Sequence, residues 1–130
     1  MLQALEDGEA LVRAEAVAQL SDKRLLDFIT NEKIDGVLFI SGDTHFGDVS
    51  RITDNTPYPF WEITSSGLSE KWKEVSPNKH RIAKGVNEVN YGFIEVDWQL
   101  EDPIIDMGLK GKDGNVIHQF QLELSEISNK

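Results

Sequence analysis

The chain has 130 residues, 39% of them hydrophobic and 28% charged, which fits one globular domain with its own core. It contains no cysteine, and this excludes disulfides, cysteine-ligated metals and a cysteine nucleophile. Thirteen basic and 23 acidic residues give a net charge of −10, so nucleic acid and anionic membrane surfaces are not expected partners. The first residues show no secretory signal and no apolar run is long enough to span a bilayer, while the compartment stays open.

The first part of the chain is predicted to be helical. Residues 9–20 are rich in alanine, which has the strongest helix propensity. Ser21 is a suitable N-cap for a second helix, and Leu25 and Ile29 stand four residues apart on one face of it. We expect this helix to end near residues 31–33.

The pattern then changes to that of strands. Residues 37–40 form a continuous apolar run bounded by Gly36 and Gly42, which is typical of a strand covered on both faces of a parallel or mixed sheet. Residues 60–64 are a second strand candidate, and the prolines at 57–59 provide a turn before it. Helices feeding a buried strand indicate an α/β arrangement.

The C-terminal third is predicted to be antiparallel β-structure, with strands over residues 91–98, 104–109 and 116–124 and a tight turn at 113–115. The inward face of the last strand is expected to carry Val116, His118, Phe120, Leu122 and Leu124, with His118 as a hydrogen-bonded core histidine. The whole sequence therefore predicts an α/β (mixed α+β) fold in a single domain over residues 1–130: N-terminal helices, a buried strand and then mostly antiparallel β.

The most informative residues for chemistry are Asp43 and His45, which follow the apolar strand. Ligand sites in open α/β sheets gather at the carboxyl ends of strands. In an extended segment these two side chains would project to the same side, with Cα atoms about 6–7 Å apart, a span suited to two neighbouring metal ions. Carboxylate and imidazole donors suit Zn, Fe, Mn or Ca. The alternative is a turn aspartate beside a half-buried, hydrogen-bonded histidine.

Four further residues are weaker candidates for contacts with a phosphate group. Ser65 and Ser66 follow a predicted strand and could offer hydroxyl and N–H groups, although a polar turn is the commoner explanation. Asn90 begins a strand near the same place, where a capping role is the alternative. Arg81 lies in a locally basic segment, residues 69–85, which could steer an anionic substrate or be a solvated loop.

Several ordered motifs resemble one known family. Residues 36–51, with their G-D-x-H motif, resemble the strand and metal-binding signature of alkaline phosphatase D-type (PhoD-like) metallophosphoesterases. Residues 57–68 resemble the family's P-Y-P and E-x-T-S-S-G-L motifs, and residues 90–98 resemble its N-Y-G-x-I-E-V-D-W strand. The resemblance covers residues 25–127 and is to the C-terminal part of the family, whereas residues 1–20 carry no family motif.

The resemblance implies a fragment of a metal-dependent phosphoric ester hydrolase, with part of a metallophosphatase-like α/β sandwich. Asp43 and His45 match the family's last metal-binding motif at a dinuclear centre of divalent or trivalent ions (Zn, Fe, Mn or Ca), and the substrate class is a small phosphate ester. The family's N-terminal ligand motifs are absent from this sequence, so we expect the isolated chain to be inactive or weakly active. The alternative is a non-catalytic interaction or remnant domain, which would pair with the missing N-terminal portion or with itself.

Overall fold

The computed structural model describes residues 23–70 and 72–130, and the chain divides into two compact units, Met1–Ile34 and Asp35–Lys130. In the first unit a helix covers residues 23–31, which confirms the helix predicted around Leu25 and Ile29 and its end. Its predicted apolar face is unevenly covered, because Ile29 is buried and Leu25 is exposed. The helix predicted over 9–20 and the N-cap at Ser21 lie outside the described residues.

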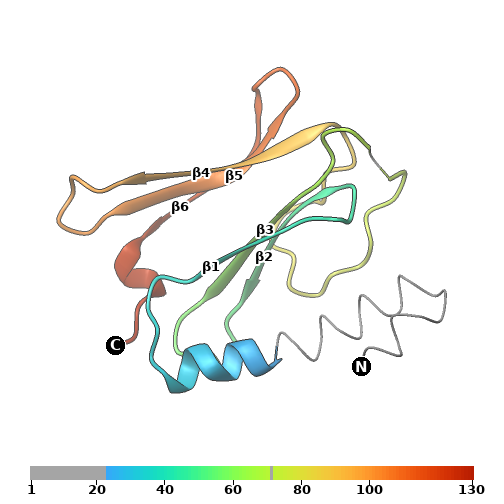
Figure 1. Cartoon of the computed structure of the whole chain (residues 1–130). Coiled ribbons are helices and arrows are strands. Elements are labelled where there is room, and N and C mark those ends of the chain that lie inside the picture. The colour runs from blue at the N-terminus through green and yellow to red at the C-terminus, as the bar shows by residue number, and fades with distance from the viewer. Residues whose placement is uncertain (1–22, 71) are drawn as a thin grey trace. The chain divides into compact units, whose positions relative to one another are not determined.

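The second unit contains two three-stranded sheets, one lying over the other (Figure 1). The first sheet has the order β1-β3-β2 and the second the order β4-β5-β6. The strands are β1 (Leu38–Ser41), β2 (Gly47–Ile52), β3 (Phe60–Ser65), β4 (Asn90–Asp97), β5 (Ile104–Gly111) and β6 (Val116–Glu123), followed by the short 3-10 helix η2 (Leu124–Ile127).

The predicted fold class is wrong. The described residues form a mostly β unit with one helix before it, not an α/β fold with N-terminal helices or part of a metallophosphatase-like α/β sandwich. The strands predicted in the C-terminal third are confirmed, and β4, β5 and β6 pair antiparallel as expected. A helix followed by an apolar strand suggested an α/β fold, in which a helix connects the parallel strands. In the structure, the connection between the parallel strands β1 and β3 contains loops and the strand β2, and no helix.

The position of β1 also differs from the prediction. β1 pairs only with β3 among the described strands and therefore forms an edge of its sheet. Ile40 retains 74% of its surface exposed, so the strand is not covered on both faces. The opposite edge of the sheet, β2, is better protected, because the segment after β3 reaches it through bridges from Arg81 to Ser50 and from Val86 to Gly47.

The core lies between the two sheets. Met107 and Leu109, on the central strand β5, are fully buried, and Ile63 on β3 is 3% exposed. The rings of Trp61 and Phe120 meet across the sheets with centroids 5.6 Å apart. The inward face predicted for the last strand is partly confirmed: Leu122 opposite Ile105 is buried, whereas Val116 at the strand's start is half-exposed.

No helix in the described part of the chain has the length and apolar character needed to cross a membrane.

Candidate functional site

Two loops meet beside the strands β1 and β3. These strands run parallel, so their carboxyl ends lie at the same edge of the sheet. The loop after β1, residues 42–46, therefore comes next to the described part of the segment that follows β3, residues 66–70 and 72. The Ser66 N–H donates to the Phe46 carbonyl at 3.4 Å, and the Trp72 N–H donates to the His45 carbonyl at 3.0 Å.

Asp43 and His45 both have left-handed backbone conformations, with φ values of 67° and 56°. Non-glycine residues adopt this conformation rarely, at a cost of about 1–3 kcal/mol each, and such residues gather at functional sites. The segment is consequently a tight bend rather than the extended stretch that the sequence predicted. Asp43 is exposed and His45 half-buried.

The His45 imidazole has two neighbours on the segment after β3. Its Nδ1 lies 3.2 Å from the Glu70 carboxylate, and its ring meets the Trp72 ring edge-to-face with centroids 6.0 Å apart. A carboxylate oxygen can only accept, so the contact favours a proton on Nδ1 and leaves a lone pair on Nε2. Metal-ligating histidines are commonly oriented by a carboxylate in this way.

Ser66 is engaged with the candidate metal loop. Its Oγ accepts hydrogen bonds from the N–H groups of Thr44 at 3.0 Å and His45 at 2.8 Å. It also lies 3.3 Å from Thr44 Oγ1. Since a hydroxyl oxygen has two lone pairs, Ser66 uses its accepting capacity within the protein. The structure therefore places Ser66 beside His45 as an internal partner of the loop.

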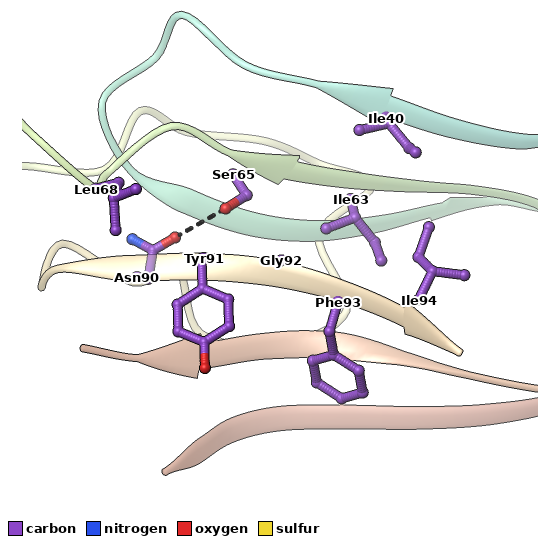
Figure 2. Close-up of a pocket in the computed structure, with 9 residues that line it drawn as sticks. All are labelled: Ile40, Ile63, Ser65, Leu68, Asn90, Tyr91, Gly92, Phe93 and Ile94. Atoms are coloured by element: carbon purple, nitrogen blue, oxygen red, sulfur yellow. Dashed lines mark hydrogen bonds between the residues drawn. The ribbon is translucent and has the colours of Figure 1, made fainter. Parts of the chain in front are cut away.

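Ser65 and Asn90 meet at one end of an open groove between the sheets (Figure 2). The Ser65 hydroxyl donates to Asn90 Oδ1 at 3.4 Å, while Asn90 Nδ2 donates to the Glu88 carbonyl at 2.8 Å. Asn90 is fully buried, and a Cβ added at Gly67 would collide with its amide. The groove has a volume of about 400 Å³ and is mostly apolar, lined by Ile40, Ile63, Leu68, Phe93 and Ile94 together with Tyr91, Gly92 and the two polar residues.

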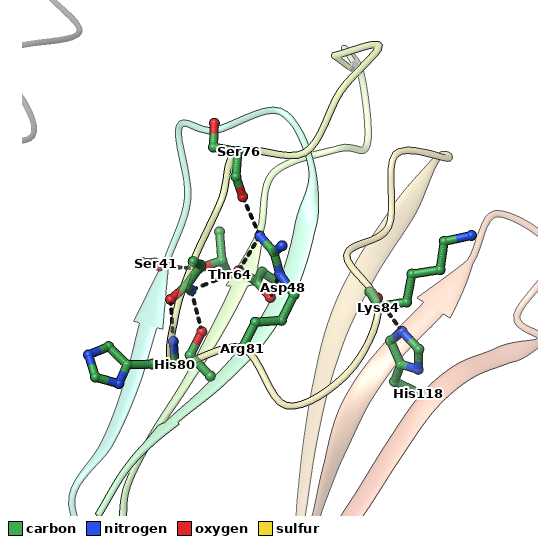
Figure 3. A network of polar contacts seen from close by, with 10 residues as sticks. Ser41, Asp48, Thr64, Ser76, His80, Arg81, Lys84 and His118 are labelled. Atoms are coloured by element: carbon green, nitrogen blue, oxygen red, sulfur yellow. Dashed lines mark hydrogen bonds and ion pairs between the residues drawn. The ribbon is translucent and has the colours of Figure 1, made fainter. Parts of the chain in front are cut away.

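Arg81 belongs to a separate network on the outer face of the first sheet (Figure 3). Its guanidinium donates to both oxygens of Asp48, at 2.8 and 3.1 Å, and to the Ser76 carbonyl at 2.6 Å. Asp48 is 4% exposed and also accepts from Asn78 Nδ2 at 3.0 Å. The charge of Arg81 is thus neutralised by a buried carboxylate and is not directed toward an open anion site.

His118 makes the hydrogen bond expected of a structural histidine. Its Nε2 lies 2.6 Å from the Lys84 carbonyl oxygen, so it donates a proton there and ties the segment after β3 to β6 (Figure 3). The side chain is half-buried rather than fully enclosed.

The donor set around the candidate loop is small. Residues 23–70 and 72–130 contain no group of three or more acidic or histidine side chains arranged to hold a metal ion. Asp43 and His45 remain predicted ligands from one loop, and the structure adds Glu70 as a neighbour of His45. Glu70 lies in the locally basic segment 69–85, and nothing in the local sequence indicates that this segment reaches His45.

Comparisons of the chain with family models, with curated proteins and with solved structures found no match.

Proposed function

We propose that this chain carries part of the metal site of a phosphoric ester hydrolase, as the C-terminal portion of a PhoD-like metallophosphoesterase. Asp43 and His45 are the proposed ligands, and the substrate class is a small phosphate ester. The proposal is supported by the ordered sequence motifs and by the conformation of the loop that holds the two residues.

The observation that carries the proposal is the pair of left-handed residues, Asp43 and His45, in one loop at the carboxyl end of β1. Glycine is the residue that adopts this backbone without strain, yet the chain has a carboxylate and an imidazole there. Both are the donor types that Zn, Fe, Mn and Ca accept. A strained backbone bearing two such donors favours a binding role over a simple turn.

The chemistry divides between the ions and the chain. Bound cations would lower the pKa of a water nucleophile and stabilise the charge that develops on the phosphoryl oxygens. This chain would supply the exposed Asp43 carboxylate and the His45 Nε2, whose orientation Glu70 assists. A catalytic zinc site normally takes three protein ligands, so two ligands give weak binding and little or no turnover in the isolated chain.

Metal addition to the 130-residue chain tests the proposal. The protein is dialysed against a chelator, Zn, Mn, Fe or Ca is added, and the melting temperature and hydrolysis of a chromogenic phosphodiester are followed. We expect at least one metal to raise the melting temperature, because a ligand that binds only the folded state stabilises it. The increase should disappear in Asp43→Ala and in His45→Ala and persist in Asp54→Ala, an exposed control in the β2–β3 turn. No increase with any of the metals contradicts the proposal.

A second candidate function is a non-catalytic interaction domain, and the edge strand β1 favours it. The four residues of β1 include no charge or proline, which are the devices that usually protect an edge. Ile40 is 74% exposed on it. A second copy of the chain could add a strand at this edge, and light scattering over a concentration series would detect the dimer. Ile40→Lys should abolish the dimer, whereas Val116→Lys, at a half-exposed apolar residue of β6, should leave it intact; a concentration-independent monomer contradicts this candidate.

A further inference from the structure

Three successive hydroxyl residues at the end of β3 have three different partners. Thr64 Oγ1 lies 2.7 Å from Ser41 Oγ, within the sheet. Ser65 donates to Asn90, toward the second sheet. Ser66 alone of the three bonds the loop after β1, through its Oγ.

The bonds to Ser66 come from two consecutive N–H groups. Thr44 lies between the left-handed residues Asp43 and His45, and its N–H and that of His45 converge on one oxygen. Consecutive N–H groups in such a bend form a concave pair of donors that binds a negatively polarised atom. In this chain the Ser66 hydroxyl oxygen occupies that position.

We infer that Ser66 is a positioning residue for the Asp43–His45 pair. Its hydroxyl holds the loop backbone in the left-handed shape from which His45 reaches Glu70 and Trp72. The metal-binding consequence rests on the function proposed above, whereas the effect on the loop does not. Ser66 itself contacts no metal in this scheme, because both of its accepting positions are used by the loop.

Removal of the Ser66 hydroxyl should first change the conformation of the loop after β1. Without this acceptor, the N–H groups of Thr44 and His45 form hydrogen bonds with water instead. The left-handed conformation then loses the contact that compensates for its strain. The His45 imidazole then samples orientations away from Glu70. Ser65→Ala is the matched control, because it removes a neighbouring hydroxyl that serves Asn90 instead of the loop.

Two measurements on the full chain separate the inference from the proposed function. Amide hydrogen exchange without metal should be about tenfold faster at Thr44 and His45 in Ser66→Ala, in keeping with the loss of a hydrogen bond at each. Exchange at these two amides should stay unchanged in Ser65→Ala and be largely restored in Ser66→Thr. In calorimetric titration with Zn or Mn, Ser66→Ala should bind about tenfold more weakly than the wild type.

Each outcome has a defined meaning. Wild-type exchange rates at Thr44 and His45 in Ser66→Ala overturn the inference. Faster exchange in Ser66→Ala supports the positioning role even if the wild-type protein binds neither Zn nor Mn. The missing metal binding of the wild type would then count against the proposed function. If the alanine variant does not fold, Ser66→Cys gives the same comparison, because its sulfur is a weak acceptor.

Discussion

Asp48 and Arg81 stand 33 residues apart in the sequence and form a two-point ion pair, with Nε 2.8 Å from Oδ1 and Nη2 3.1 Å from Oδ2. The Asp48 carboxylate is 4% exposed, and the Arg81 side chain is 19% exposed. The pair fastens the segment after β3 to the strand β2, next to the bridge between Ser50 and Arg81. It therefore has a structural role that does not depend on any ligand.

Removal of one partner from this pair should destabilise the fold strongly. Asp48→Ala leaves the Arg81 guanidinium partly buried without its carboxylate, and we expect a loss of about 3 kcal/mol in the free energy of unfolding. Urea denaturation measures it. Asp27→Ala is the control, because its partner Lys23 lies at the same 2.8 Å in a pair that is 78% and 58% exposed. That change should cost less than about 1 kcal/mol. Equal losses in the two variants would contradict a special role for the buried pair.

Glu70 should influence metal binding through the tautomer of His45. Glu70→Ala removes the carboxylate that favours a proton on Nδ1, so the nitrogen spectrum of the imidazole in the metal-free protein should shift toward a mixture of tautomers. If the proposed metal site is correct, affinity for Zn or Mn should also fall by about tenfold. Titration calorimetry measures this second effect.

Glu74→Ala provides the comparison for Glu70, since Glu74 is an exposed acid of the same loop. Its metal affinity and its His45 spectrum should match the wild type. An unchanged tautomer ratio in Glu70→Ala would show that the 3.2 Å contact does not orient the ring.

The parts of the fold that were predicted correctly depend on local sequence. The turn at 113–115 contains Gly114, whose φ of +79° suits a hairpin, and β5 and β6 form on either side of it. The strand β2 was not predicted, because its residues Asp48 and Ser50 are polar and yet buried. Burial of these two polar side chains is possible because Arg81 donates to Asp48 and Asn78 donates to Ser50. Both donors belong to a segment that is distant in the sequence.

In the candidate site, too, local sequence predicts some features and contacts between distant segments determine the others. Gly42 and Asp43 after an apolar run were enough to indicate a loop with ligand-type side chains. The contacts of that loop with Ser66 and Glu70 follow from the parallel pairing of β1 with β3, which local patterns do not specify. The apolar run 37–40 likewise predicts a strand without saying whether neighbours flank it on both sides, so its place at a sheet edge was missed.

Acid pH should weaken the link between Asp35 and the C-terminus. The backbone N–H of Asn129, followed by its side-chain amide, lowers the pKa of the Asp35 carboxyl below its usual value. A lowered folded-state pKa means that this stabilisation is present above about pH 4 and is lost as the pH falls through the folded value. Asp35→Ala and Asn129→Ala should therefore be non-additive in melting temperature at neutral pH and additive in strong acid. Because Asn129→Ala keeps the backbone N–H, the cycle measures the bond from the side-chain amide, and additive effects at both pH values would contradict that part of the coupling.

Tyr58 should make the fold sensitive to alkali. Burial raises the pKa of its phenol, and the negative charge of Asp35 adds to this, while a hydrogen bond with the Val37 backbone opposes it. The native state then resists ionisation, so stability is complete below about pH 10 and declines as the pH rises toward the folded value.

Tyr58→Phe removes that titration and keeps the ring, which meets Phe60 edge-to-face at 5.0 Å. At neutral pH we expect a loss of about 1 kcal/mol from the missing hydrogen bond. From roughly pH 9 to 11 its melting temperature should fall less steeply than that of the wild type, because the unfolded chain no longer gains from ionising this phenol. Tyr91→Phe is the matched control, since Tyr91 is 37% exposed, and it should follow the wild-type curve. Parallel alkaline curves for the wild type and Tyr58→Phe would show that the buried phenol does not govern the decline.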